Sequence, residues 1–312
     1  MSEELRNITP LAGKIGWTTT AAELVEPGHM GCPGCGGALS MRHALKVLGP
    51  ETIVVMPACC WAIIAGGQPT TALSVPLLHT PFAVAAAAAG GVRQALAAQG
   101  QDEVTVMAWA GDGGTFDIGL QSISGAAERG EDIIFVCYDN EAYMNTGIQQ
   151  SSATPPGAWT TTTPAGKDFQ YAKKDILAII RAHNPAYLAS ATIAYPEDFQ
   201  AKFEKAKQAR GFRFLHLLAA CPSGWKIESK DSLQVTRLAV ECGVFPLLEM
   251  DEKGGLRATV VPEKTRPVSD YLTAQGRFRK LTGEEIELWQ QLVDERRRVY
   301  GYDGFVRNGE IG

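Results

Sequence analysis

Short buried strands alternate with helices along most of this chain, and this alternation limits the possible folds more than any other feature. Apolar runs typical of buried strands span 52–57, 104–110, 132–140, 187–193 and 212–221. Helical periodicity covers 38–48, 82–99, 175–183 and 196–210. Because parallel strands need crossover connections, which are usually helices, the sequence predicts an α/β fold with a doubly wound parallel sheet covered on both faces.

The helical and strand periodicity weakens after Cys221 and returns only in a charged helix predicted at 284–300. We therefore expect one domain over residues 1–230. Residues 231–312 are expected to form a C-terminal extension that wraps around this domain or packs on partner subunits.

The composition is that of a soluble globular protein, with 45% apolar and 20% charged residues in 312. A net charge of −5 provides no basic surface for nucleic acid. The apolar tract from Phe82 is shorter than the ~20 residues that span a bilayer, so no membrane association is expected. The N-terminus does not resemble a signal peptide, which predicts a cytoplasmic protein with reduced thiols. Cys137 and Cys242 fall on apolar faces and are expected to be packing residues.

A glycine-rich turn, Gly111-Asp112-Gly113, directly follows the strand predicted at 104–110. In doubly wound sheets, ligands bind outside the carboxyl ends of the strands. Glycines let the backbone approach an anion closely, and the Asp112 carboxylate is a hard oxygen ligand for a divalent cation. Asn140 ends the next predicted strand, so both side chains could reach one cation. The turn indicates a metal-bridged diphosphate site, and the alternative is an ordinary turn in which Asp112 caps a helix.

A C-x-x-C pair, Cys32 and Cys35, lies near the start of the chain. A zinc site would need a second close pair of Cys or His, and a thioredoxin-like pair would follow a strand; neither accompanies this pair. An iron–sulfur cluster tolerates dispersed thiolates. Cys59 and Cys60 follow the first predicted strand and Cys221 ends the fifth, at the same edge as the glycine-rich turn. Spacing alone leaves a cluster and inert thiols as equal alternatives.

The glycine-rich turn, the helix and strand after it, and the terminal Asn140 resemble the signature of thiamine diphosphate enzymes. The resemblance implies that Asp112, Asn140 and the backbone carbonyl of Ala142 bind Mg²⁺. It also implies that Gly111 and Gly113 contact the diphosphate, in a sheet of the thiamine diphosphate-binding type.

Longer stretches resemble the beta subunits of heteromeric 2-oxoacid:ferredoxin oxidoreductases over nearly the whole chain. They read GHMGCPGCGGALSMRHALK, GDGGTFDIGLQSISGAAERG, YDNEAYMNTGIQQSSATPPG, CPSGW and YLTAQGRFRKL. The resemblance implies a [4Fe–4S] cluster held by Cys32, Cys35, Cys60 and Cys221. Residues 1–230 would then be a thiamine diphosphate-binding and iron–sulfur domain.

The same resemblance gives further residues a role. Family members usually read Thr-Gly-Cys where this chain has Ala58-Cys59-Cys60, so Cys59 is expected to be an extra thiol. His29 precedes the cysteine pair and is expected to support the cofactor, with a purely structural imidazole as the alternative. Asn145 and Thr146 are the expected polar contacts to substrate, and stabilisation of their own loop is the alternative.

The resemblance implies oxidative decarboxylation of a small anionic substrate, with electrons passed through iron–sulfur clusters to ferredoxin. In such enzymes a neighbouring subunit supplies the carboxylate that activates the aminopyrimidine. This chain also lacks the C-x-x-C-x-x-C motifs of ferredoxin-like clusters. Other subunits of a hetero-oligomer are therefore expected to complete the thiamine site and to carry the further clusters.

The substrate expected from the sequence is oxalate. Pyruvate-type members commonly carry acidic residues after the cluster cysteine and in a Phe-Glu pair, where this chain has Ala62 and Ala83. Less negative charge favours a more anionic substrate, and the chain most resembles an oxalate oxidoreductase beta subunit. The alternatives are a pyruvate:ferredoxin oxidoreductase, a non-redox thiamine diphosphate enzyme with inert cysteines, and a non-enzymatic C-x-x-C metal-binding module.

Overall fold

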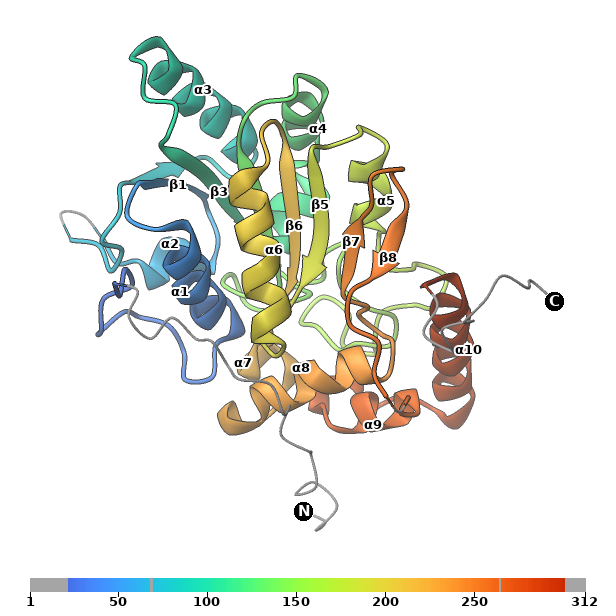
Figure 1. Ribbon diagram of the computed structural model, residues 1–312. Helices are drawn as coiled ribbons and strands as arrows, with labels where there is room; N and C mark the ends of the chain where they lie inside the picture. Colours follow the sequence, from blue (N-terminus) through green and yellow to red (C-terminus); the bar gives the residue numbers. More distant parts are fainter. Residues whose placement is uncertain (1–21, 68–69, 264, 301–312) are drawn as a thin grey trace.

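A mixed sheet forms the centre of the computed structural model, which describes residues 22–67, 70–263 and 265–300 (Figure 1). Within these residues its eight strands lie in the order β2-β1-β3-β4-β6-β5-β7-β8. The strands are β1 (Thr52–Pro57), β2 (Leu77–Thr80), β3 (Thr105–Gly111), β4 (Ile134–Asp139), β5 (Tyr187–Ala191), β6 (Arg213–Leu218), β7 (Leu248–Met250) and β8 (Leu256–Ala258).

The first six strands are mutually parallel, as predicted, and the last two form an antiparallel edge. All five predicted strands are present. The prediction omitted β2, β7 and β8, and in this respect it was wrong. These three strands have only three or four residues each, and β2 is partly exposed at the sheet edge. None of them therefore has a run of buried apolar residues long enough to recognise in the sequence.

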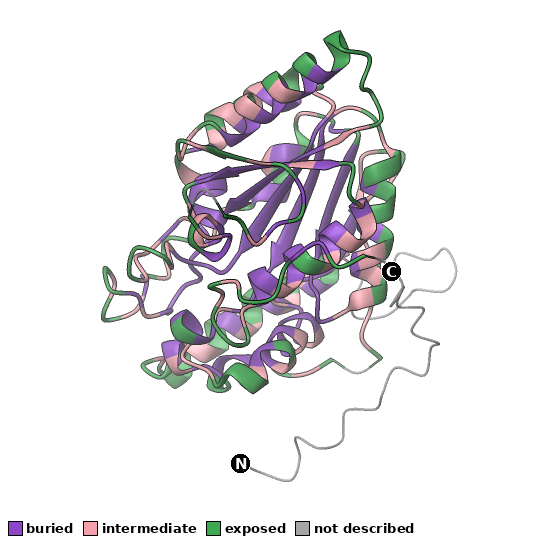
Figure 2. Ribbon diagram, turned by 90° about the vertical axis from the view of Figure 1, so that its left-hand side faces the viewer, coloured by how far each residue is buried: buried purple, intermediate pink, exposed green. Residues whose placement is uncertain are grey.

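Helices cover both faces of the sheet, which makes it doubly wound. One face carries α1 (Gly36–Leu48), α2 (Cys60–Ile64) and α6 (Pro196–Gln208). The other carries α3 (Ala85–Ala98), α4 (Leu120–Glu128) and α5 (Ile176–Arg181). Figure 2 shows the strands buried between these two layers. Side chains that alternate along each strand fill one core or the other, which accounts for the continuous apolar runs in the sequence.

The C-terminal segment covers the lower end of the sheet in Figure 1, where β5 and β6 end. It contains α7 (Pro222–Trp225), α8 (Ser232–Glu241), α9 (Val268–Thr273), a 3₁₀ turn η4 (Gly276–Phe278) and α10 (Gly283–Tyr300). The predicted helix at 284–300 is α10, whereas α8 and α9 were not predicted. A third core, with Trp225 and Tyr271 at its centre, contains residues from both sides of position 230. No helix in the described part of the chain is long and apolar enough to cross a bilayer.

Candidate active site

Four neighbouring strands end side by side, and each is followed by one of the predicted site residues. The strands β1, β3, β4 and β6 are adjacent and parallel, so their carboxyl ends lie side by side. The chain continues from these ends to Cys60, Asp112, Asn140 and Cys221, in that order across the sheet. Residues that are far apart in the sequence are therefore placed in one row by backbone hydrogen bonding alone.

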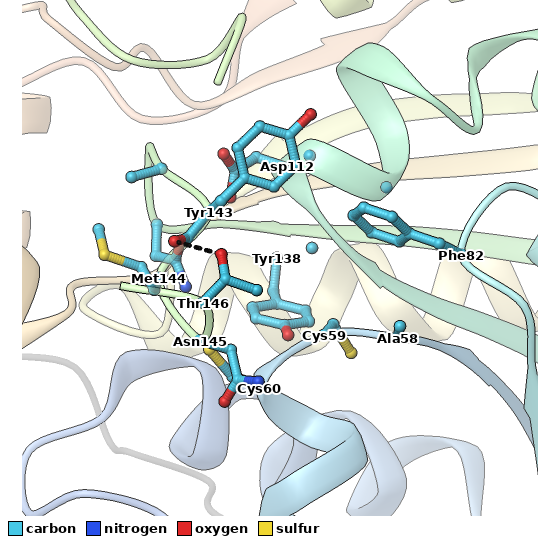
Figure 3. A pocket seen from close by; sticks show the side chains of 15 residues that line it. Ala58, Cys59, Cys60, Phe82, Asp112, Tyr138, Tyr143, Met144, Asn145 and Thr146 are labelled. Atoms are coloured by element: carbon cyan, nitrogen blue, oxygen red, sulfur yellow. Dashed lines mark hydrogen bonds between the residues drawn. The ribbon is translucent and has the colours of Figure 1, made fainter. Parts of the chain in front are cut away.

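A pocket opens along this row (Figure 3). In this view Asp112 lies above the Tyr138 ring and Cys60 lies below it. The pocket also contains the predicted substrate contacts Asn145 and Thr146, which are exposed. Its lining consists of Ala58, Cys59, Cys60, Phe82, Gly111, Asp112, Gly113, Gly114, Tyr138, Asn140, Ala142, Tyr143, Met144, Asn145 and Thr146.

Three polar groups converge at the upper end of this pocket. One end of the Asn140 amide lies 3.0 Å from Asp112 Oδ1 and 3.0 Å from the Ala142 carbonyl oxygen. With the amide oxygen at that end, three oxygens face one point and no donor lies between them. Such a set binds a hard divalent cation, whereas without a cation the amide nitrogen would take this position and donate to both oxygens. The donor set therefore fits Mg²⁺.

The Asp112 carboxylate is buried, with 1% of the residue exposed. Its Oδ2 accepts a hydrogen bond of 2.5 Å from the Ser151 hydroxyl. Burial raises the pKa of Asp112 well above the usual range of a carboxyl group, and the nearby Asp139 adds to the shift. A buried carboxylate without a counter-charge is destabilised, so a bound cation would stabilise its ionised form.

Gly113 is required by a close approach between two loops. A Cβ on this residue would lie 2.1 Å from the Tyr143 ring. The Tyr143 hydroxyl donates to Asp117 Oδ2 at 2.8 Å, which fixes the ring in place. A π-helical turn over Gly113–Asp117 begins at this point and leads into α4, the helix expected after the glycine-rich turn. Such turns occur often at functional sites.

The four cysteines predicted as cluster ligands come from three segments. Cys60 lines the lower end of this pocket, Cys32 and Cys35 share the loop before α1 and line a second pocket, and Cys221 follows β6. Cys35 and Cys221 precede α1 and α7, and their sulfurs accept backbone N–H groups of Ala38 and Gly224, each at 3.4 Å. Cys60 begins α2, and Cys32 is exposed. Hydrogen bonds from N–H groups to sulfur are among the contacts that tune iron–sulfur clusters.

The thiols of these cysteines interact with one another electrostatically. Burial, with smaller contributions from the neighbouring Cys59, Cys221 and Cys35, raises the pKa of Cys60 to about 12. Burial likewise raises the pKa of Cys221 to about 11, with Cys35 and Cys32 contributing. These mutual effects place the four thiols, together with Cys59, in one neighbourhood.

Among the described residues, however, no three His, Cys, Asp or Glu side chains are close enough together to bind a single metal ion. A cluster of four irons occupies the space between its cysteines and so holds them farther apart than one ion does. Four thiols that form no single-ion site are a donor set of the kind that a four-iron cluster, held by four cysteine thiolates, would use.

The other predicted residues have distinct positions. Cys59 lines the pocket beside the Tyr138 hydroxyl, whose hydrogen bond partly offsets the rise in the Cys59 pKa caused by burial. His29 lies outside this pocket, in a second one with Cys32 and Cys35, where its Nδ1 accepts the Gly31 N–H at 3.1 Å.

Cys137 and Cys242 are both fully buried in the core, as expected of packing residues.

Several residues of the site were not found by reasoning from the sequence. Ser151 and Tyr143 contact the glycine-rich turn from the long loop after β4, and Phe82 covers Gly114 from the segment before α3. No spacing rule links these loop residues to a strand end, since only the folded loop brings them to the pocket. The stretch that contains Ser151 and Tyr143 was among those that carried the family resemblance.

Comparisons with known proteins agree with this geometry. Residues 59–217 match the family described as "Thiamine pyrophosphate enzyme, C-terminal TPP binding domain". The pyruvate synthase subunit PorB of Methanothermobacter thermautotrophicus is 49% identical over 275 residues, which cover 87% of this chain and 95% of the relative. The ketoisovalerate oxidoreductase subunit VorB of Pyrococcus horikoshii is 46% identical over 277 residues, covering 86% and 89%.

The fold is shared with a solved structure, the 2-oxoglutarate:ferredoxin oxidoreductase from Magnetococcus marinus. Its TM-score is 0.59 at 20% identity, with 92% of this chain and 91% of the other covered. The two subunit families cover almost the full length of this chain at high identity. The chain therefore belongs to the beta subunits of thiamine diphosphate-dependent 2-oxoacid:ferredoxin oxidoreductases.

Proposed function

We propose that this subunit holds thiamine diphosphate through Mg²⁺ at Asp112, Asn140 and Ala142, and a [4Fe–4S] cluster at Cys32, Cys35, Cys60 and Cys221. One observation carries the proposal: Asp112 and Cys60 line the same pocket, from adjacent parallel strands. A cation-binding group and a cluster-binding group in one pocket suit an enzyme that oxidises its substrate beside an electron acceptor.

The protein side chains have defined tasks in this proposal. The bound thiamine diphosphate supplies the carbanion that attacks the substrate, and the cluster accepts electrons singly. Asp112 and Asn140 orient the cation, and Ser151 fixes the carboxylate that does so. Gly111 and Gly113 line the pocket at the start of the π-helical turn, and their backbone would face the diphosphate, while the missing side chain of Gly113 admits the Tyr143 ring. His29 lines the second pocket with Cys32 and Cys35, so in this proposal we assign it to the cysteine loop.

The substrate-binding part of the pocket is formed by Asn145 and Thr146, opposite Phe82. The Thr146 hydroxyl donates to Gln149 Oε1 at 2.6 Å, so it is oriented by its own loop. Small neutral polar groups of this kind can bind a carboxylate and a carbonyl oxygen without excluding either by charge. We therefore propose a short 2-oxoacid as the substrate, with ferredoxin as the electron acceptor and other subunits completing the enzyme.

Pyruvate is the substrate that the relatives favour, since PorB subunits of pyruvate synthase from several organisms are 42–49% identical to this chain. Oxalate, predicted from the sequence, is a second candidate. The observation in its favour is that Asp112 is the single acidic residue among the described residues that line the pocket. A pocket with so little negative charge accommodates a dianion at a smaller electrostatic cost.

Reduction of ferredoxin by the purified complex tests both candidates. The complex is assayed with pyruvate and coenzyme A, with the branched 2-oxoacid ketoisovalerate and coenzyme A, and with oxalate alone. We expect pyruvate to give the largest kcat/KM. Reduction by oxalate alone would reverse the assignment. Failure of all three substrates in a complex that contains bound cofactor and cluster would contradict the proposed substrate class.

A further inference from the structure

Glu141 lies between two of the proposed cation ligands, Asn140 and Ala142, in an uncommon backbone conformation. Its φ is +70°, in the left-handed region that non-glycine residues rarely adopt. The Glu141 N–H donates to Asp139 Oδ1 at 2.8 Å, and its carbonyl accepts the Thr154 hydroxyl at 2.7 Å. This conformation turns the Asn140 amide and the Ala142 carbonyl toward the same point. Strained conformations of this kind are maintained by the surrounding structure and concentrate at functional sites.

The Glu141 side chain extends away from the cation site into a buried ionic cluster. Its Oε2 accepts from Arg277 Nη2 at 2.6 Å, and its Oε1 accepts from Lys173 Nζ at 2.8 Å. The side chains of Glu141 and Arg277 are only 3% and 2% exposed. The carboxylate therefore joins the end of β4 to two segments that are distant in the sequence.

Arg277 is itself held firmly. Its Nε donates to Gln275 Oε1 at 2.9 Å, and its Nη2 lies 3.1 Å from the Tyr271 hydroxyl. Its guanidinium group stacks on the Trp225 ring, 4.2 Å from the ring centre. The Trp225 Nε1 in turn donates to the Asn140 carbonyl at 2.9 Å. Arg277 thus contacts the Asn140–Ala142 segment by two routes, through Glu141 and through Trp225.

We propose that Arg277 is a positioning residue for the cation site. By holding the Glu141 carboxylate and stacking on Trp225, it fixes the segment that presents the Asn140 and Ala142 oxygens to Asp112. The stretch that contains Arg277, YLTAQGRFRKL, carried part of the family resemblance but contributes no residue to the pocket. This inference rests on the proposed function, because it assigns Arg277 a role toward the proposed Mg²⁺.

The test measures cation affinity separately from folding. Purified complex is stripped of cofactor, and Mg²⁺ is titrated by calorimetry at saturating thiamine diphosphate. We expect Arg277→Gln to weaken Mg²⁺ binding by about tenfold or more, the scale expected when a partner that orients a metal ligand is lost. Arg277→Lys, which keeps the charge, should recover part of this loss. Arg279→Gln is the matched control, because Arg279 lies two residues away and is exposed; its Mg²⁺ affinity should equal that of the wild type.

A double variant separates positioning from stability. Arg277→Gln alone leaves Glu141 with one cation fewer in a buried cluster and should lower the melting temperature. Adding Glu141→Gln removes the carboxylate that lost its Arg277 partner and should restore the melting temperature while Mg²⁺ binding stays weak. The proposal would be overturned if the double variant recovered both the melting temperature and the Mg²⁺ affinity. It would also be overturned if Arg277→Gln bound Mg²⁺ with wild-type affinity.

If Arg277→Gln does not assemble, Arg277→Lys decides the question. Mg²⁺ binding at least threefold weaker than wild type supports the positioning role, and wild-type binding rejects it. Failure of the proposed function is recognised separately: the wild type and Arg279→Gln would then both show no Mg²⁺-dependent binding of thiamine diphosphate.

Discussion

The two ends of the pocket differ in how their functional groups are held. At the upper end, Asp112 and Asn140 follow adjacent strands and are almost fully buried. The Asn140 amide lies 3.0 Å from Asp112 Oδ1, and Asp112 also accepts a hydrogen bond from Ser151. At the lower end, the four cysteines come from three segments, Cys32 is exposed, and no three of them form a site for a single metal ion. The upper end is preorganised for a cation, whereas in the proposed function the lower end is completed only by the cluster that it binds.

This difference has a thermodynamic consequence. A preorganised site loses little conformational entropy when its ligand binds, so each group contributes directly to affinity. A site assembled by its metal couples metal binding to local folding. Substitutions at the upper end should change affinities by graded amounts, and substitutions of ligands at the lower end should remove the cluster altogether.

The largest effect is expected from Cys60→Ala. Loss of one of four thiolates should abolish the cluster and reduce ferredoxin reduction to background. Iron content and the broad absorption near ~400 nm of an iron–sulfur chromophore measure this. Cys59→Ala, one residue away, is the control and should keep its iron. If Cys60→Ala kept its full iron content and Cys59→Ala lost its iron, Cys59 would be the cluster ligand and Cys60 the extra thiol.

A smaller but still large effect is expected from Asp112→Ala. Removal of the carboxylate leaves only neutral oxygens facing a hard cation. Binding of thiamine diphosphate with Mg²⁺ should weaken by more than the roughly 10–100-fold that loss of a supporting partner causes. Calorimetric titration of the complex measures this, and the cluster should remain intact. Wild-type affinity would show that the glycine-rich turn binds no metal.

Ser151→Ala should have a graded effect, because Ser151 supports Asp112 without binding the cation. We expect Mg²⁺ affinity to fall by about tenfold, measured at saturating thiamine diphosphate. Ser152→Ala is the matched control, since Ser152 contacts Asp117 only through its backbone N–H. An all-or-none loss of the cofactor in Ser151→Ala would contradict the preorganised character of the upper end.

The smallest effect is expected from Cys137→Ala, in the core between the sheet and the helices of its second face. Deleting a buried sulfur should destabilise the fold by about 1 kcal/mol. Thermal unfolding should shift by about 2–4 °C, with unchanged iron content. Cys242→Ala should behave in the same way. Loss of iron in either variant would show that the cysteine group extends beyond the four proposed ligands.

The sequence predicted the parts of the fold that depend on long periodic segments. The five buried strands and helices such as α1 and α6 combine apolar periodicity with clear ends. The row of strand ends, and with it the meeting of Asp112, Asn140, Cys60 and Cys221, followed from parallel topology. The short edge strands were missed because they have only three or four residues each. The helices α8 and α9 were missed because their burial depends on tertiary contacts in the core around Trp225.

The site was only partly predictable for a similar reason. Asp112 and Asn140 stand at strand ends, where position indicates function. Ser151 and Arg277 reach the same site from a loop and from a turn that lie far along the chain, and nothing in their local sequence indicates their partners. The resemblance of their stretches to a family identified the neighbourhood but not the contact.

The adjacency of β1 and β3 has a consequence for how such enzymes can diversify. If the proposal is correct, the cofactor and the first electron acceptor are attached to neighbouring strands, about 4.8 Å apart in the sheet. The spacing between these two attachment points is then set by the main-chain ladder and not by side chains in the pocket. Loop residues of the pocket such as Asn145 and Thr146 could therefore change during evolution, and with them the acid that is accepted, without moving either attachment point.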